Sequence, residues 1–264
     1  TYAIGMSHHG MQVLYGIMNR RDDWCCERAF TPWGDMESKL REHDLPLYGL
    51  ESFSPLSEFD VVGFSLQYDL CYTNVLTMLD LGRIPLHGAE RSLSDPLVIA
   101  GGPCVQNPEP MSDFIDAFVV GDGEEALPML CDAWLDCRAE ATDRAGALHR
   151  LAVRMQVGVY VPSLYQCIEA AGQGGTPEPI FDDIPSVIEP GVVQDLDAVP
   201  LPTRPVVPNV EVVQDRIAIE IMRGCPGRCR RFPGVNHHPR MPGVSIRRLP
   251  GRASGRWSGF PERC

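Results

Sequence analysis

The sequence contains one pair of residues whose type and spacing could bind a metal. Cys225 and Cys229 lie on one loop, directly after an apolar run that predicts a strand at residues 216–221. The arginines around this loop favour the thiolate form, which is the form that binds metals. Two thiolates do not complete a site, because iron–sulfur clusters and structural zinc use three or four protein ligands. The pair therefore indicates part of a metal centre or two free thiols, and His237 or His238 could complete a zinc site.

Ser65, Gly101 and Gly102 are candidates for a ligand site because each follows an apolar run typical of a buried strand. Ligands of parallel α/β sheets bind at the carboxyl ends of the strands. A hydroxyl there can meet a ligand, and a glycine lets a planar ligand approach the backbone closely. The alternatives are a serine that caps a turn and a glycine pair that makes a tight turn.

The loop at residues 121–126 has the spacing Gly-x-Gly-x-x-Ala between a predicted strand and a predicted helix, which is a dinucleotide-binding pattern. Glu124 and Glu125, however, place two carboxylates at the helix N-terminus, where pyrophosphate would otherwise bind. We therefore reject a dinucleotide here. Gly121 and Gly123 are retained as candidate contacts to another cofactor.

The elements that would position these residues form an α/β pattern. Continuous apolar runs predict buried strands at residues 60–66, 97–100 and 117–120, and residues 2–6 are expected to end a further strand. Helical periodicity predicts helices at residues 10–19, 35–43, 72–81 and 124–136. Apolar strands that alternate with helices favour a Rossmann-like (flavodoxin-like) parallel sheet. His8 and His9 follow the first predicted strand, where an imidazole could bind a metal; the alternative is an exposed pair at a helix start.

Several of these segments together resemble a known family. Residues 213–226, followed by Cys229, resemble the entry to the radical S-adenosylmethionine (SAM) domain of the B12-binding-domain radical SAM proteins. Residues 63–68, 100–103 and 120–125 are similar to the cobalamin-binding-type Rossmann-like domain that precedes the radical SAM domain in those proteins.

The resemblance implies a plan of four parts. These are a cobalamin-binding-type domain at residues 1–136, a connector with short strands and a Pro-rich linker at 137–215, the start of a radical SAM partial barrel at 216–230, and a basic tail at 231–264. The tail is expected to be disordered or translated out of frame, because a shifted frame can encode the Ser-Thr-Thr-Ile-like residues that follow the cysteine motif in the family. The rival interpretation is a genuine basic tail that binds an anionic partner.

The resemblance also implies cofactors. In the family, three cysteines in the pattern CxxxCxxC hold three irons of a [4Fe-4S] cluster, and SAM binds the fourth iron. Cys225 and Cys229 would be the first two ligands, and the third position is occupied by Phe232. We therefore expect radical SAM chemistry on an unknown substrate in intact relatives and no SAM cleavage by this chain, with cobalamin as a further cofactor. The alternatives are a non-catalytic corrinoid-binding α/β module and a Cys/His zinc-binding protein.

The charge of the chain limits its partners. The 264 residues carry a net charge of −12, but residues 221–264 contain ten arginines and one acid, Glu262. The acidic remainder argues against a nucleic-acid interface there. No apolar run approaches the length of a membrane span. The scattered cysteines favour a reduced, cytoplasmic compartment, and the expected partner is a small-molecule or macromolecular substrate.

Overall fold

The computed structural model describes residues 1–170, 173–200 and 206–213, and after residue 213 only residues 218, 220, 222, 223, 245 and 246. The chain divides into two compact units. The first unit consists of Thr1–Val193 and Pro200–Arg216, and the second consists of Gln194–Val199 and Ile217–Cys264.

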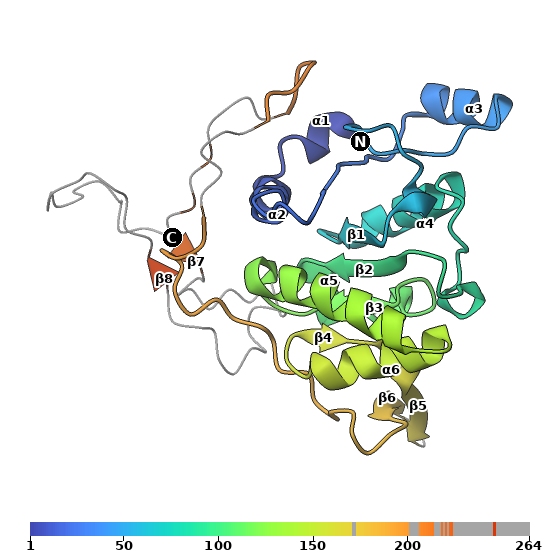
Figure 1. The fold of residues 1–264 in the computed structure, drawn as a ribbon, viewed down its shortest axis with the longest axis vertical. Coiled ribbons are helices and arrows are strands. Elements are labelled where there is room, and N and C mark those ends of the chain that lie inside the picture. The colour runs from blue at the N-terminus through green and yellow to red at the C-terminus, as the bar shows by residue number, and fades with distance from the viewer. Residues whose placement is uncertain are drawn as a thin grey trace, which may run out of the picture. The chain divides into compact units, whose positions relative to one another are not determined.

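The first unit is built on a four-stranded sheet, shown in Figure 1. The strands, in spatial order, are β1 (Val61–Ser65), β2 (Leu97–Gly101), β3 (Ala117–Val119) and β4 (Val159–Tyr160). β1, β2 and β3 are parallel, whereas β4 is antiparallel to β3. The predicted α/β architecture is confirmed, but the expectation of an all-parallel sheet is wrong at β4. Two consecutive helices connect β3 to β4, and each helix reverses the chain direction, so β4 enters the sheet from the opposite side.

The helices lie between and around these strands. They are α1 (Tyr2–Gly5), α2 (His9–Met18), α3 (Gly34–Glu42), α4 (Tyr72–Leu81), α5 (Gly123–Glu140) and α6 (Arg144–Arg154). A hairpin of β5 (Tyr165–Ala170) and β6 (Gln173–Pro179) follows, and β7 (Met222–Arg223) pairs with β8 (Ser245–Ile246) in the second unit. None of the helices in the described ranges is long and apolar enough to cross a membrane.

The expectation that residues 2–6 end a strand is wrong, because Tyr2–Gly5 is the helix α1. The Tyr2 ring packs edge-on against Phe30, with the ring centroids 5.6 Å apart. Gly5 also faces the Phe30 ring. The apolar residues of this segment suggested a strand, but in the structure they form a helical turn that packs against Phe30.

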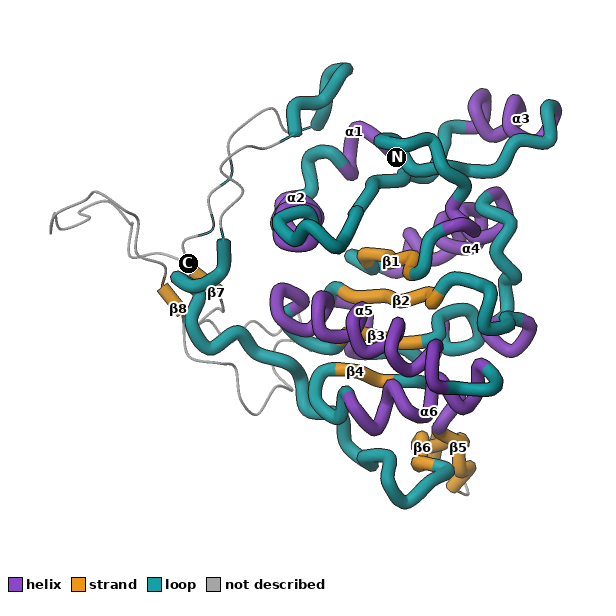
Figure 2. Tube along the Cα trace, viewed as in Figure 1, coloured by secondary structure: helices purple, strands orange, loops and turns teal. Residues whose placement is uncertain are grey.

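The sheet separates two hydrophobic cores, and α5 and α6 cover one of its faces (Figure 2). Leu97 and Ile99 of β2 belong to the core beneath α5 and α6. Val98 and Ala100 belong to the opposite core, to which α3 and α4 contribute. Because successive strand residues point to opposite faces, an uninterrupted apolar run fills both cores.

A buried carboxylate, Asp116, links β2 to α6 through hydrogen bonds. Asp116 precedes β3, and its Oδ2 accepts a hydrogen bond of 2.7 Å from the Val98 backbone N–H. The same oxygen lies 2.7 Å from Arg144 Nη2 and 3.0 Å from Arg91 Nη1. The three side chains are at most 6% exposed. Arg144 also lies over the ring of Trp134, which is fully buried on α5.

The compact unit continues beyond residue 136, where the sequence predicted the end of the first domain. Leu151 of α6 and Val159 of β4 are buried in the same core as Trp134 of α5. β4 and β5 lie within residues 137–215, where the sequence analysis expected a connector with short strands. The strand predicted at 216–221 lies almost entirely outside the described residues.

Candidate functional site at the carboxyl edge of the sheet

Ser65, Gly101 and Gly102 come together at the carboxyl ends of β1 and β2. Ser65 is opposite Gly101 in the parallel register, and the next residue, Leu66, donates its N–H to the Gly101 carbonyl at 2.7 Å. Ser65 is exposed, and the two glycines are partly exposed. This edge is where parallel α/β sheets bind ligands.

Gly102 is required by the protein's own loop. Its φ is +104°, a conformation that favours glycine, and a Cβ there would lie 2.8 Å from the Leu66 carbonyl oxygen. The same carbonyl accepts the N–H of Cys104 at 3.1 Å. The tight-turn alternative therefore accounts for glycine at position 102 without a ligand.

Gln67 is a candidate site residue that the sequence did not single out. Its Nε2 donates a hydrogen bond of 2.8 Å to Ser65 Oγ. Beyond it, Asp69 Oδ1 accepts from the Cys104 thiol, with the two atoms 3.6 Å apart. The sequence indicates these residues only by their position shortly after a strand. It does not show that Asp69 and Cys104 meet, because they are 35 residues apart.

The polar groups of this edge suit hydrogen bonding better than nucleophilic attack. Burial, together with Cys104 and Asp69, raises the pKa of the Tyr72 phenol to about 12. Burial is also the main cause that raises the pKa of the Cys104 thiol. Both groups are therefore protonated at neutral pH, and both are already hydrogen-bonded within the protein.

Gly121 lies at the carboxyl end of β3 and is exposed, but its backbone lies directly against that of Gly191. Its φ is +103°, and a Cβ would lie 2.1 Å from the Gly191 carbonyl oxygen. Gly191 donates its N–H to the Val120 carbonyl at 2.9 Å and accepts the Asp122 N–H at 2.8 Å. Gly191 therefore makes the close backbone contact at Gly121 that we expected a cofactor to make.

Gly123 begins α5 and faces another helix of the same domain. A Cβ there would meet the Leu14 side chain of α2 at 3.4 Å. Glu124 and Glu125 occupy the first turn of α5, as predicted when the dinucleotide was rejected. Contacts within the protein therefore account for glycine at positions 121 and 123, and Ser65 remains the exposed hydroxyl of this edge.

Of the two histidines near the N-terminus, His8 has a local role. His8 caps α2, because its Nδ1 accepts the Met11 N–H at 3.0 Å. The Nε2 of His9 is buried and has no hydrogen-bond partner among the described residues. Within the described part of the chain, no group of three or more His, Cys, Asp or Glu side chains could hold a metal.

Cys225 and Cys229, the predicted metal ligands, lie outside the described residues, as do Phe232, His237 and His238. Their spacing is a property of the sequence alone. The seven cysteines of the described ranges are free thiols.

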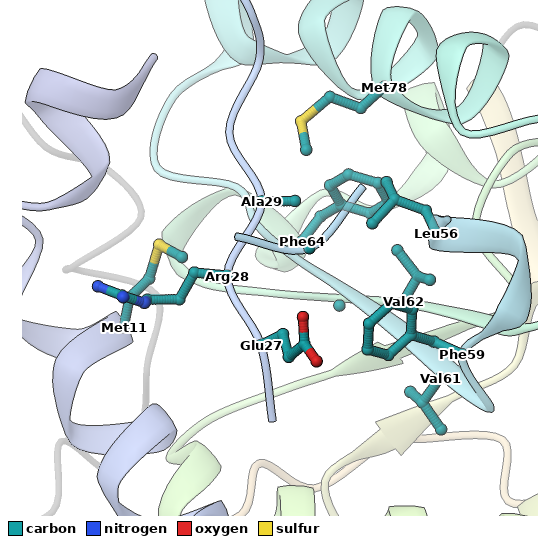
Figure 3. Close-up of a pocket in the computed structure, with 12 residues that line it drawn as sticks. Met11, Glu27, Arg28, Ala29, Leu56, Phe59, Val61, Val62, Phe64 and Met78 are labelled. Atoms are coloured by element: carbon teal, nitrogen blue, oxygen red, sulfur yellow. The ribbon is translucent and has the colours of Figure 1, made fainter. Parts of the chain in front are cut away.

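A cavity lies beside β1. Figure 3 shows this cavity between β1 and the non-helical segment at residues 26–30. Its lining combines apolar residues, including Met11, Phe59 and Met78, with the charged residues Glu27 and Arg28. The cavity is separate from the Ser65–Gln67 pair, which is not part of its lining.

The fold and this edge define the class of the protein: an α/β domain with helices on both faces of its sheet and accessible polar groups at the carboxyl ends of β1 and β2. Residues 10–162, more than half of the chain, match the family model for radical SAM proteins, N-terminal. The chain therefore belongs to the family formed by the N-terminal regions of radical SAM proteins. The radical SAM relationship predicted from the sequence is confirmed.

A relative gives a further, shorter similarity. A 95-residue stretch is 33% identical to an uncharacterized protein of Methanocaldococcus jannaschii, covering 35% of this chain and 20% of that protein. The aligned stretch thus spans only about one fifth of the relative's length. No solved structure matches the chain.

Proposed function

We propose that this chain is a ligand-binding module of a radical SAM protein and that its ligand lies against Ser65 and Gln67. The observation that carries the proposal is the family match at residues 10–162, whose span includes the whole four-stranded sheet and this edge. The exposed hydroxyl of Ser65 and the amide of Gln67, 2.8 Å apart, supply hydrogen-bonding groups at the place where such sheets bind ligands.

A corrinoid is the ligand that the sequence resemblance favours. Its peripheral amide groups match the hydroxyl and amide chemistry of Ser65 and Gln67. Axial ligation to cobalt by His8 does not fit, because its Nδ1 accepts the Met11 N–H and the neutral ring then carries its proton on Nε2. We therefore propose hydrogen-bonded recognition of the corrinoid periphery, with no histidine ligand from His8.

Titration with hydroxocobalamin, followed by absorbance and equilibrium dialysis, tests this site. We expect Ser65→Leu and Gln67→Leu each to weaken binding about tenfold or more, because each loses a hydrogen bond and adds an apolar group that the ligand's amides must face. Ser94→Leu is the matched control, since Ser94 is an exposed serine that precedes β2 and therefore lies towards the opposite edge of the sheet. Equal affinity in all three variants, or no binding by the unmodified chain, would contradict a corrinoid at this edge and would leave the family membership unchanged.

The cluster chemistry of the family requires a donor set that this chain does not complete. A [4Fe-4S] cluster supplies the electron that cleaves SAM, and its irons need cysteine thiolates. Cys225 and Cys229 fit the first two positions of CxxxCxxC, but phenylalanine at 232 has no atom that can bind iron. We propose that the chain, as it stands, binds its ligand without cleaving SAM.

Anaerobic reconstitution with iron and sulfide distinguishes a complete donor set from an incomplete one. We expect the unmodified chain to hold well under one cluster per chain after desalting and to form no 5′-deoxyadenosine from SAM. Phe232→Cys is expected to raise the iron bound per chain, because it supplies the third thiolate. Phe260→Cys, which adds a thiol outside the motif, is the matched control. A stoichiometric cluster with SAM turnover in the unmodified chain would contradict the proposal.

A further inference from the structure

Two large apolar side chains lie exposed on the loop that follows β1. Tyr68 is 52% exposed and Leu70 is 83% exposed, whereas Leu66, at the start of the same loop, is buried. The loop directly follows Ser65 at the carboxyl end of β1, where parallel α/β sheets bind ligands. Exposed apolar residues are common on protein surfaces. Their significance here depends on whether the loop holds them in a fixed position.

Backbone hydrogen bonds fix both ends of this loop. At its start, Leu66 donates its N–H to the Gly101 carbonyl at 2.7 Å, and the Leu66 carbonyl accepts the Cys104 N–H at 3.1 Å. At its end, Cys71 donates its N–H to the Tyr68 carbonyl at 3.0 Å, within a short 3-10 turn that leads into α4. The loop is therefore tied to β2 on one side and continuous with a helix on the other.

A side-chain contact fixes the middle of the loop. Asp69 lies between the two apolar residues, and its Oδ1 accepts a hydrogen bond from the Cys104 thiol, with the two atoms 3.6 Å apart. Tyr72, the first residue of α4, hydrogen-bonds to both groups. Because Cys104 belongs to the loop that follows β2, this contact holds the two loops together. An apolar surface that is ordered before binding loses little conformational entropy when a ligand packs on it.

The two loops at this edge carry almost no charge. Residues 65–72 and 101–106 contain a single charged side chain, that of Asp69, whose carboxylate is hydrogen-bonded within the protein. Phosphate and carboxylate groups of ligands are typically bound by arginine or lysine side chains, and neither residue occurs in these loops. The surface therefore suits a ligand that presents amide groups and an apolar face to it.

We propose that Tyr68 and Leu70 form an apolar platform on which the face of the corrinoid macrocycle packs, while Ser65 and Gln67 hydrogen-bond to its peripheral amides. This inference rests on the proposed function, because it names further contacts of a corrinoid at the same edge. A corrin ring is apolar on its faces and carries its amides around the rim. Consecutive Cα atoms are about 3.8 Å apart, so the Leu70 Cα lies within about 11 Å of the Gln67 Cα. One macrocycle can therefore make both sets of contacts.

Titration with hydroxocobalamin tests the apolar platform. We expect Tyr68→Ser and Leu70→Ser each to weaken binding about tenfold, because each removes apolar surface that the ligand buries. Both side chains are exposed in the free chain, so these substitutions should shift Tm by about 2 °C or less. Tyr68→Phe keeps the ring and removes only the hydroxyl, and we expect it to bind as tightly as the unmodified chain.

Leu45→Ser is the matched control for Leu70→Ser. Leu45 is also an exposed leucine, with 55% of its surface accessible. Leu47, two residues further on, donates its N–H to the Leu81 carbonyl at the C-terminal end of α4. Because α4 begins next to the apolar platform and runs away from it, Leu45 lies towards the opposite edge of the sheet. We expect the Leu45→Ser chain to bind hydroxocobalamin as the unmodified chain does.

The outcomes separate the apolar platform from the proposed function. If Ser65→Leu and Gln67→Leu weaken binding but the two serine substitutions do not, the platform is wrong and the proposed function stands. Equal losses in Tyr68→Phe and Tyr68→Ser would assign the contact to the hydroxyl and would also overturn the platform. Sedimentation of Leu70→Ser that shows lost self-association with unchanged affinity would assign this surface to a second copy instead. No binding of hydroxocobalamin by the unmodified chain would contradict the proposed function and the platform together.

Discussion

Replacement of Asp116 by alanine is expected to lower the free energy of unfolding by about 3–5 kcal/mol, because it leaves two buried arginines without a counter-charge. The Asp116 carboxylate is 2% exposed and lies 2.7 Å from Arg144 and 3.0 Å from Arg91. It also accepts the Val98 N–H at the start of β2. Burial already lowers the pKa of the Arg91 guanidinium, and Asp116 opposes that shift. Its loss would therefore affect both the charge balance and the sheet.

Urea unfolding of Asp116→Ala measures this loss, and Asp132→Ala is its matched control. Asp132 also pairs with an arginine at 2.7 Å, but its side chain is 48% exposed. Surface ion pairs contribute about 1 kcal/mol or less, so the control should stay close to the unmodified chain. If Asp116→Ala loses no more stability than Asp132→Ala, the buried triad is not the stabilising element that its geometry indicates.

Gly121→Val is the second large effect, with an expected loss of about 3 kcal/mol or more. The residue has a φ of +103°, which a β-branched side chain adopts only with strain. Its Cβ would also lie 2.1 Å from the Gly191 carbonyl oxygen, which belongs to the backbone and cannot rotate away. The variant should therefore release the segment around Gly191 from the end of β3, or fail to fold.

Thermal unfolding without any ligand separates this packing role from cofactor binding. Gly123→Ala is the control, because its Cβ would meet only the flexible Leu14 side chain at 3.4 Å and alanine favours a helix. We expect its stability to change by about 1 kcal/mol or less. A ligand-free Gly121→Val protein as stable as the Gly123→Ala protein would contradict the packing account and would return Gly121 to the candidate cofactor contacts.

Much of the functional identity is contained in local sequence. The apolar runs that became β1, β2 and β3 are continuous, and each is long enough to define a strand without knowledge of its neighbours. The carboxylates of Glu124 and Glu125 excluded a dinucleotide because a helix start is itself a local feature. The match of Cys225 and Cys229 to the first two positions of CxxxCxxC, with Phe232 at the third, is likewise a matter of spacing along the chain.

The tertiary structure decided which of the candidate residues face an accessible edge. Contacts between residues far apart in the chain leave no periodic signal, so the sequence could not show that the Gly191 backbone lies against Gly121, or that Asp69 meets Cys104. The direction of β4 depends on two successive helices folding back against one face, which helical periodicity does not report.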